Sequence, residues 1–232
     1  MKKNFVLRAT AIVMAAALVF AGCSKKGSGD GADSGSGSVK SVNSASKENP
    51  ATDFRYDLNA TGDGVIIEAH IGKTGGKVII PANIEGFPVV EIGIGAFEEP
   101  KEGDYSNRVT EVLIPESVTK LGGKNSVVNY TGEVFKNCIK LKSVNIPSGV
   151  TIIEPGTFEN CTSLTSITIP ESVIEIGYSA FEGCTELTDV KLPTHSIEYS
   201  TYYGLDQTFF RCSKLSLAVR KAITDTGYKG IF

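Results

Sequence analysis

The chain has 232 residues, enough for one domain or two small ones, and 41% of them are hydrophobic, which excludes a wholly disordered protein. Lys and Arg number 23 and Asp and Glu number 26, so the formal net charge is -3. This balance provides no basic surface that would displace counterions, and nucleic acid is therefore not expected as a partner.

Residues 1–22 have the features of a secretory signal peptide. Basic residues precede an apolar run that ends at Phe20, and this run is shorter than the roughly 20 residues that span a bilayer. The pair Ala21-Gly22 then precedes Cys23, an arrangement that resembles the lipobox of bacterial lipoproteins, although Phe20 stands where that motif usually has Leu. The resemblance implies cleavage before Cys23 and a lipid on its thiol. The alternative is an ordinary secreted protein that is cleaved nearby.

Residues 23–50 are predicted to be a linker without stable structure. From Ser24 to Pro50 the chain contains eight Ser, five Gly and almost no large apolar side chains, so it cannot bury enough surface to offset its conformational entropy. A flexible chain of this length has a root-mean-square reach of ~30 Å. We expect the linker to tether a folded domain, residues 51–232, to a lipid anchor in the cell envelope.

Residues 51–80 are predicted to form a β-rich N-terminal cap. Two alternating segments, 54–58 and 65–69, flank a Gly-containing turn, and the stretch Asp57–Glu68 nearly matches a calcium-binding EF-hand loop. An EF-hand needs a helix on each side, whereas both flanks here alternate as strands do. The pattern favours a β-hairpin turn, and calcium binding there is left open.

A repeat of 23 residues dominates the rest of the sequence. Three sets of apolar residues recur at this step: Phe135, Phe158 and Phe181; Cys138, Cys161 and Cys184; and Leu141, Leu164 and Leu187. A fixed period of this length is the signature of a solenoid, in which each coil buries the apolar face of its neighbour.

Each unit of the repeat can be interpreted physically. The alternating segment 167–169 is a short strand, and Pro170 ends it because proline donates no backbone hydrogen bond. The apolar residues of 173–176 point inward on a return path, and Gly177 permits a bend. Residues 180–184 are predicted to form a single helical turn over the core.

The period predicts about five coils over residues 81–216. Extra residues near 98–108, 123–131 and 195–204 are expected to form loops outside the stack. Residues 217–232 are predicted to be a C-terminal cap that contains a short helix and covers the last apolar face.

The repeated pattern Leu-x-x-Ile-x-Ile-Pro-x-x-Val-x-x-Ile-Gly-x-x-Ala-Phe-x-x-Cys resembles the BspA-like leucine-rich repeats, also called the Treponema pallidum type. The resemblance covers about residues 51–232. It implies a leucine-rich-repeat solenoid, a right-handed superhelix that is mostly β with single helical turns. It also implies adhesion, because BspA-like proteins include binders of host matrix proteins and mediators of contact between bacteria.

No cofactor or metal site is expected from the chemically active residues. The four repeat cysteines, with Cys212 as the last, fall on successive coils, too far apart to bind one zinc ion. Buried free thiols are favoured over disulfides between adjacent coils, which stay an alternative. His70 and His195 are isolated, and the segment 72–77 fails the spacing of a phosphate-binding loop. No acid, base and nucleophile converge, so the chain is predicted not to be an enzyme.

The candidate binding residues lie on outward strand positions and in a Tyr-rich insertion. They are Glu111, Asn145, Thr168 and Lys191 on the strands, and Tyr199, Tyr202 and Tyr203 in the insertion. Tyrosines often anchor interfaces, but they also pack against their own domain, and both interpretations are open.

The sequence therefore predicts a lipid-anchored module that binds an unidentified protein, with host extracellular matrix as a candidate ligand. The outer membrane or cell surface is favoured over the inner membrane. The alternative is a structural envelope protein that faces the periplasm and has no adhesive role. The membrane contact would be made through the lipid on Cys23.

Overall fold

The computed structural model describes residues 47–73, 75–98, 109–123, 132–202 and 204–232. The predicted signal peptide, Cys23 and nearly all of the predicted linker lie outside these residues, as do Tyr203 and most of the two insertions near 98–108 and 123–131. Within the described part, the longest helix has nine residues, and no helix is long and apolar enough to cross a membrane.

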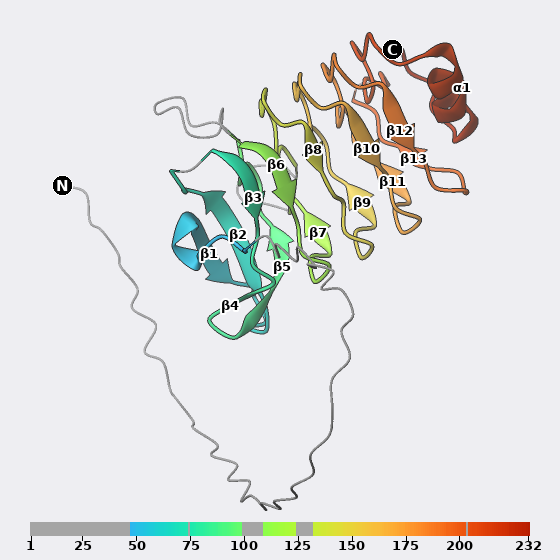
Figure 1. Ribbon diagram of the computed structural model, residues 1–232. Coiled ribbons are helices and arrows are strands. Elements are labelled where there is room, and N and C mark those ends of the chain that lie inside the picture. Colours follow the sequence, from blue (N-terminus) through green and yellow to red (C-terminus); the bar gives the residue numbers. More distant parts are fainter. Residues whose placement is uncertain (1–46, 74, 99–108, 124–131, 203) are drawn as a thin grey trace, which may run out of the picture. The chain divides into compact units, whose positions relative to one another are not determined.

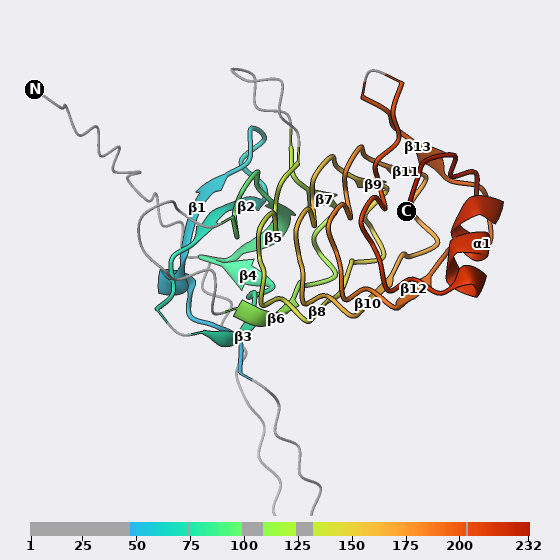
Figure 2. The ribbon, with the colours of Figure 1, turned by 90° about the horizontal axis from the view of Figure 1, so that it is seen from above.

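The described residues fold into stacked coils, and successive coils contribute strands to two parallel ladders (Figures 1 and 2). The first ladder contains β2 (Val65–His70), β5 (Phe87–Ile92), β7 (Lys120–Leu121), β9 (Ile152–Ile153), β11 (Glu175–Ile176) and β13 (Glu198–Tyr199). The second contains β3 (Gly76–Ile79), β6 (Val109–Leu113) and β8 (Ser143–Val144), followed by the separate pair β10 (Ser166–Thr168) and β12 (Asp189–Lys191).

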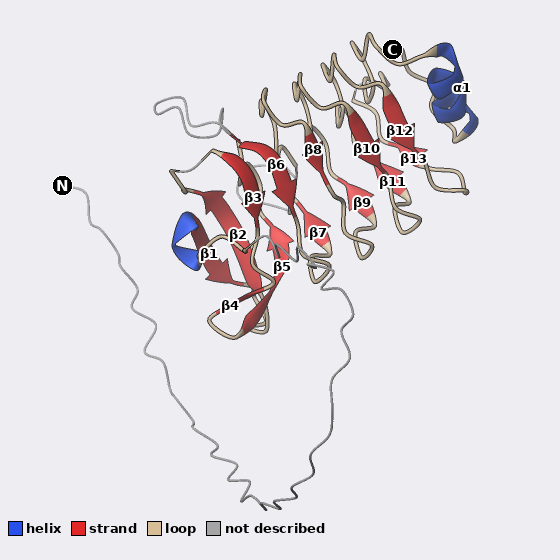
Figure 3. Ribbon diagram, in the orientation of Figure 1, coloured by secondary structure: helices blue, strands red, loops and turns tan. Residues whose placement is uncertain are grey.

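The pairing confirms that the chain is a leucine-rich-repeat solenoid. Ser166 lies in register with Asp189, and Glu175 lies in register with Glu198, so in the regular coils a strand residue meets the residue 23 positions later. A parallel ladder with one constant step is the geometry that equal coils produce when they stack. Most of these strands are only two or three residues long, because each coil turns at both ends of its strand (Figure 3).

The N-terminal end begins with a short 3-10 helix, Ala51–Asp53, and the strand β1 (Phe54–Leu58). β1 pairs antiparallel with β2, so the calcium-loop-like segment is a β-hairpin turn, as predicted. The short strand β4 (Asn83–Ile84) pairs antiparallel with β5, and β2 and β3 already belong to the parallel ladders. The antiparallel strand β1 thus terminates the first ladder.

The C-terminal end is closed by the helix α1 (Leu217–Asp225), which confirms the predicted short helix. The Ser216 side chain caps it by accepting a hydrogen bond from the Val219 amide. The next strand of the second ladder would be expected near residues 217–219, so α1 replaces a strand. The stack thus ends without another open strand edge at this position.

A column of aromatic rings runs through the core of the stack. Neighbouring ring centroids are separated by 5.0 Å for Phe97–Phe135, 5.5 Å for Phe135–Phe158, 5.2 Å for Phe158–Phe181 and 5.2 Å for Phe181–Phe209. The three rings that the period predicted therefore lie in one column. His70 extends it at the N-terminal end, stacked 5.3 Å from Phe97, and Tyr228 closes it with an edge contact 5.4 Å from Phe209.

The buried cysteines form a second column beside the rings. Each thiol donates a hydrogen bond to the carbonyl oxygen of a ring residue in the preceding coil, as from Cys161 to Phe135 at 3.1 Å and from Cys184 to Phe158 at 3.2 Å. All four described cysteines are buried, and none of them is in a disulfide. Burial raises the pKa of the Cys161 and Cys184 thiols well above its ordinary value, so they remain protonated donors.

The segment after each return strand is a series of tight turns, where the sequence analysis expected one helical turn. Along residues 156–161 the backbone amides alternate between two kinds of acceptor. Every second amide donates to the carbonyl three residues earlier in its own coil, and the amides between them donate to carbonyls of the next coil. The amides of Gly156, Phe158 and Asn160 make the inter-coil bonds, to the carbonyls of Tyr178, Ala180 and Glu182. A helix would use all of these amides internally, so the alternation replaces it and binds neighbouring coils together.

Left-handed backbone conformations recur at two positions of this turn segment. The first column has positive φ at Gly95, Glu133, Gly156 and Ser179, and the second has positive φ at Asn137, Asn160, Gly183 and Arg211. Most side chains disfavour this region, and only Gly and Asn adopt it readily. The turns therefore hold the half-buried Glu133 and the buried Ser179 in a defined orientation, which matters for the site described next.

Candidate functional site

The strand-face candidates do not gather into one site. Glu111 forms an ion pair with Lys77 at 2.9 Å, and the Asn145 amide bonds both the backbone nitrogen and the carbonyl of Ile114. Asn145 thus fastens one coil to the previous one. Thr168 and Lys191 are exposed and lie next to each other in the β10–β12 pair. This face is small and polar, and no aromatic side chain anchors it.

The insertion tyrosines divide into two environments. Tyr199 is largely buried: its hydroxyl bonds the Thr226 hydroxyl at 2.6 Å, and its ring meets Tyr228 edge-on at 5.3 Å. Burial raises the pKa of Tyr199 to about 12, so the hydroxyl stays protonated. Tyr199 therefore packs within the C-terminal end of the solenoid. Tyr203 lies outside the described residues.

Tyr202 is the exposed member of the set, with 57% of its surface accessible. The backbone amides of Tyr202 and Leu205 each donate to the other residue's carbonyl, both at 3.0 Å, and these two bonds form an antiparallel bridge in the insertion. The Tyr202 ring lies 5.3 Å from that of Tyr178 in the preceding coil, at an angle of 44°. Sequence reasoning missed Tyr178, because it stands in a regular repeat unit and only the stacking places it beside the insertion.

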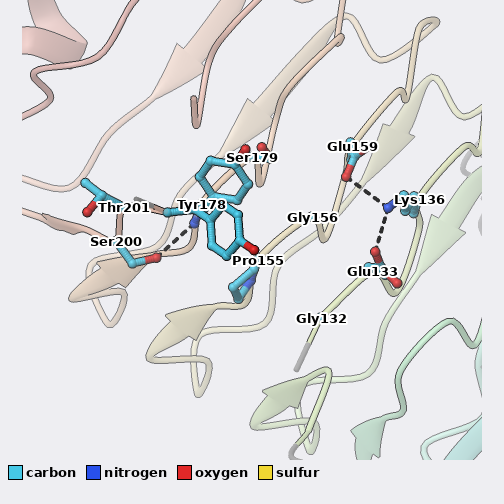
Figure 4. Close-up of a pocket in the computed structure, with 11 residues that line it drawn as sticks. Gly132, Glu133, Lys136, Pro155, Gly156, Glu159, Tyr178, Ser179, Ser200 and Thr201 are labelled. Atoms are coloured by element: carbon cyan, nitrogen blue, oxygen red, sulfur yellow. Dashed lines mark hydrogen bonds and ion pairs between the residues drawn. The ribbon is translucent and has the colours of Figure 1, made fainter. Parts of the chain in front are cut away.

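Tyr178 and Tyr202 form one end of a surface groove of about 610 Å³ that crosses four successive coils (Figure 4). The groove is lined by Gly132, Glu133, Lys136, Pro155, Gly156, Glu159, Tyr178, Ser179, Ser200, Thr201 and Tyr202. All of these residues belong to the turn segments or to the insertion that follows β13, and none belongs to either strand ladder. The groove is therefore a product of the turns.

The hollow arises from one column of the repeat in which side-chain size increases from coil to coil. Gly132, Pro155 and Tyr178 occupy equivalent positions 23 residues apart. The first has no side chain, the second has a compact ring, and the third has a large aromatic ring. The floor is consequently low at the first two coils and rises into an aromatic wall at the third.

Glycine is required on both sides of Pro155. A Cβ atom on Gly132 would lie 1.8 Å from the Pro155 carbonyl oxygen, and one on Gly177 would lie 2.3 Å from the Pro155 nitrogen. Both distances are far below van der Waals contact, and the obstructing atoms are backbone. The two glycines therefore allow three coils to approach closely enough to form a continuous floor.

An ion triad forms the side of the groove at the first two coils. The Lys136 ammonium pairs with Glu133 at 2.5 Å and with Glu159 at 3.2 Å, one partner from its own coil and one from the next. Burial opposes the charge on Lys136, but the bonds to the two carboxylates outweigh it and raise its pKa. Two carboxylates against one ammonium leave a surplus of one negative charge.

Hydrogen bonds hold the aromatic wall in place. The Tyr178 hydroxyl donates to the Gln207 side chain at 2.5 Å, and the Tyr178 amide donates to the Ser200 hydroxyl at 2.9 Å. Ser179, beside the ring, donates its hydroxyl to Glu182 at 2.6 Å. Preorganised side chains lose little conformational entropy on binding, so such a wall favours recognition.

The two histidines do not line this groove, and they have different environments. His70 is a ring of the core column, and burial lowers its pKa although the nearby Asp53 carboxylate opposes the shift. His195 is exposed, and its ring nitrogens lie 2.8 Å from the Ser196 carbonyl and 2.9 Å from the Glu171 carbonyl. Neither histidine is placed beside a nucleophile in these contacts.

The predicted hairpin turn is closed by its own side chains. The Asn59 carbonyl oxygen accepts bonds from the amides of Asp63 and Gly64, and the Asn59 amide donates to Asp63 at 2.9 Å. Within the described ranges no group of three or more His, Cys, Asp or Glu residues is arranged to hold a metal ion. The surface feature with the most developed geometry is therefore the groove.

Comparison with known proteins supports the repeat assignment. Residues 128–226 match the family described as the BspA type leucine rich repeat region, in six copies. A search of curated protein sequences gave no match.

Several solved structures show similarity to this chain. One is the T. pallidum leucine-rich repeat protein TpLRR, with 24% identity, a TM-score of 0.48, and coverage of 80% of this chain and 99% of that one. A leucine-rich repeat protein from Bacteroides ovatus shares 26% identity, with a TM-score of 0.49, over 70% of this chain and 44% of its own.

A leucine rich cell surface protein from Faecalibacterium prausnitzii shares 24% identity, with a TM-score of 0.47, over 73% of this chain and 53% of its own. The chain thus spans about half the length of the Bacteroides and Faecalibacterium proteins. The 23-residue step, the aromatic and cysteine columns and the family match together show that residues 128–226 consist of BspA-type leucine-rich repeats.

Proposed function

We propose that this protein is a cell-surface interaction module that binds a protein ligand in the groove that ends at Tyr178 and Tyr202. The observation that carries the proposal is the groove itself, which combines an exposed, fixed aromatic pair with a charged side. Aromatic anchors set in a preformed concave surface supply most of the binding energy at protein interfaces. The repeat family is one of binding modules, and this supports a function without catalysis.

The strand face supports this function less well. Among the residues predicted there, Asn145 is engaged with the backbone of Ile114 and Glu111 with Lys77, so neither is placed for an incoming ligand. Thr168 and Lys191 are exposed but lack an aromatic neighbour. The groove is therefore the preferred surface, and the strand face provides the control position for its test.

Surface display is the second part of the proposal. A lipid on Cys23 and the linker 23–50 would hold the repeat domain off the membrane at a root-mean-square distance of ~30 Å, as expected for a flexible chain of this length. The cell-surface name of the Faecalibacterium protein agrees with this location. Adhesion to host matrix proteins or to other cells follows as the physiological role.

Site-specific photocrosslinking on intact cells tests the binding function. A benzoylphenylalanine at position 202, in place of Tyr202, should give a crosslink to one defined protein that mass spectrometry identifies. The same probe at the exposed position 168, in place of Thr168, should give none, because Thr168 lies on strand β10 and does not line the groove. Crosslinks from position 168 alone would transfer the function to the strand face, and crosslinks from neither position would refute a protein-binding role.

Anchoring and exposure are tested separately. The substitution Cys23→Ser should abolish incorporation of a palmitate label and move the protein from the membrane to the soluble fraction. Protease added to intact cells should digest the repeat domain. A chain that survives on intact cells but is digested after lysis would instead be the periplasmic structural protein considered in the sequence analysis.

A further inference from the structure

We infer that the groove recognises an extended, arginine-bearing segment of its protein ligand, with a guanidinium group against Tyr178 and Tyr202 and cationic charge beside Glu133 and Glu159. This inference rests on the proposed function and specifies the chemistry of the partner. It is drawn from the charge balance of the groove, from the tilt of its aromatic wall and from the spacing of its parts.

The charge balance selects a cation. Lys136 is the ammonium group of the lining, and it is shared between two carboxylates at 2.5 and 3.2 Å. The side chains of this triad are only 22–24% exposed, so solvent screens the surplus negative charge less than it would at an open surface. A cationic ligand neutralises this charge, whereas an acidic ligand meets repulsion from it.

The aromatic wall distinguishes arginine from other cations. Planar guanidinium groups stack on aromatic faces while their N–H groups stay free to bond acceptors at the edge, which a compact ammonium does less well. The Tyr178 and Tyr202 rings are tilted by 44° and do not form one flat platform. A flat platform would suit a sugar ring, whereas these two rings contact each other with centroids 5.3 Å apart, and a guanidinium would stack on the outer face of the pair.

The length of the groove fits an extended peptide. The core rings show that successive coils are 5.0–5.5 Å apart, so the coil of Tyr178 lies roughly 10 Å from the coil of Glu133 two steps earlier. An extended ligand segment in the polyproline II conformation rises about 3.1 Å per residue and returns to the same face every three residues, so three residues cover roughly the same distance. Two arginines three positions apart would therefore reach the aromatic wall and the carboxylates together.

The bare floor supports a peptide backbone. Gly132, Pro155 and Gly156 present no long side chain, so a strand of ligand can approach the coils closely between the wall and the triad. Gly156 has a φ of +64°, which disfavours larger residues, and a Cβ atom there would meet Glu133 and Glu159 at 3.3 Å. The shape of the floor and the charges beside it thus point to the same occupant.

Fluorescence anisotropy with the purified full-length chain tests the inference. The probe is a labelled peptide, Gly-Ser-Gly-Arg-Ser-Gly-Arg-Gly-Ser, and its control has citrulline, the neutral isostere, at both arginine positions. Loss of the charge-assisted bonds and cation–π contacts should weaken the citrulline peptide by about tenfold or more. The arginine peptide should also lose affinity as salt is added, while binding of the citrulline peptide should change little.

Three variants locate the binding. Tyr202→Leu and Glu159→Gln should each weaken the arginine peptide by about tenfold, because each removes one of the two contacts. Asp189→Asn, on the exposed strand β12, changes the net charge as Glu159→Gln does and should leave binding unchanged. Lys136→Gln should strengthen binding severalfold, because both carboxylates then lack their internal cation.

The outcomes separate this inference from the proposed function. If crosslinking at position 202 captures a protein but the arginine and citrulline peptides bind equally, the module binds a protein of other chemistry and the inference is refuted. Weaker binding by Lys136→Gln would also overturn it. If maltoheptaose or a chitin oligosaccharide saturates the groove while the arginine peptide does not, the site is a glycan site and both proposals fail.

Discussion

The backbone of Gly132 lies so close to Pro155 of the next coil that a Cβ atom on Gly132 would come within 1.8 Å of the Pro155 carbonyl oxygen. Nothing in this contact can rotate away, because both partners are backbone. The close approach shapes the floor of the groove and also sets how tightly two coils stack. A glycine in a surface turn thus has a role in packing as well as in binding.

We predict that Gly132→Ala destabilises the protein by about 2 kcal/mol or more, since overpacking against an immovable neighbour forces the coils apart. Chemical denaturation followed by circular dichroism measures the change. Gly156→Ala is the matched control. Its Cβ atom would meet only flexible Glu side chains, at 3.3 Å, so its cost should be limited to the roughly 1 kcal/mol strain of a left-handed backbone. Equal effects of the two substitutions would contradict the close-packing argument.

The aromatic column predicts a large loss of stability at its centre. Phe158→Ala should lower the free energy of unfolding by about 3–5 kcal/mol, because it opens a cavity between the fully buried rings of Phe135 and Phe181. Ile174→Ala, at a side chain that is 59% exposed, should change it by less than about 1 kcal/mol. Thermal unfolding of both variants checks the contrast, and a small effect at Phe158 would mean that the rings do not support the stack.

His70 makes the N-terminal end of the column sensitive to pH. Burial lowers its pKa in the folded state below the ordinary value of 6.5, although Asp53 opposes the shift. As the pH falls below about 6.5, the unfolded chain therefore takes up a proton that the folded chain resists. The stabilisation is complete above the ordinary pKa and is lost as the pH falls through the lower, folded value. Urea denaturation midpoints between about pH 5 and pH 8 should decline on the acid side.

The substitution His70→Phe should remove that acid-side decline while keeping a ring in the column. His195 provides the comparison, because its bonds to the Ser196 and Glu171 carbonyls raise its pKa. Its contribution has the opposite sign, being present below the ordinary pKa and lost as the pH rises through the folded value. His195→Gln should therefore leave the decline caused by His70 in place. A decline that survives in the His70→Phe protein must come from other groups.

The thiol column predicts four unreactive cysteines. Burial raises the pKa of Cys212 to about 12 and shifts Cys161 and Cys184 in the same direction, so the thiolate that attacks an alkylating reagent is scarcely populated. Iodoacetamide at pH 8 should label none of the repeat cysteines in the folded protein and all four after unfolding in urea. Mass spectrometry of the digested protein reads out each site. Rapid labelling of the folded chain would show that the column opens in solution.

The repeat could be predicted from the sequence because its apolar residues recur at equal spacing along the chain. Phe135, Phe158 and Phe181 recur every 23 residues, and such a step has one simple physical solution, a stack in which these rings meet. The hairpin after β1 and the helix α1 were predicted for similarly local reasons. The helical turn was predicted wrongly, because the sequence shows apolar spacing but not that alternate amides bond to the neighbouring coil.

The groove was outside the reach of sequence reasoning for a geometric reason. Tyr178 is unremarkable within its own repeat unit, and it becomes a wall only because Pro155 and Gly132 precede it in the same column. Lys136 and Glu159 are 23 residues apart, yet they form an ion pair across adjacent coils. Tyr202 was singled out from the sequence, but its partner Tyr178 was not. The 23-residue period does not extend into the insertion, so it could not predict which residue Tyr202 would contact.

The sequence by itself determined the repeated fold, because apolar side chains at equal spacing are all buried when equal coils stack in a row. The tertiary structure alone decided the groove, because its shape and charge depend on which non-repeating side chains stacking brings together. Core positions repeat since every coil needs the same packing. Surface positions are free to differ from coil to coil, and that freedom is where a binding site can form.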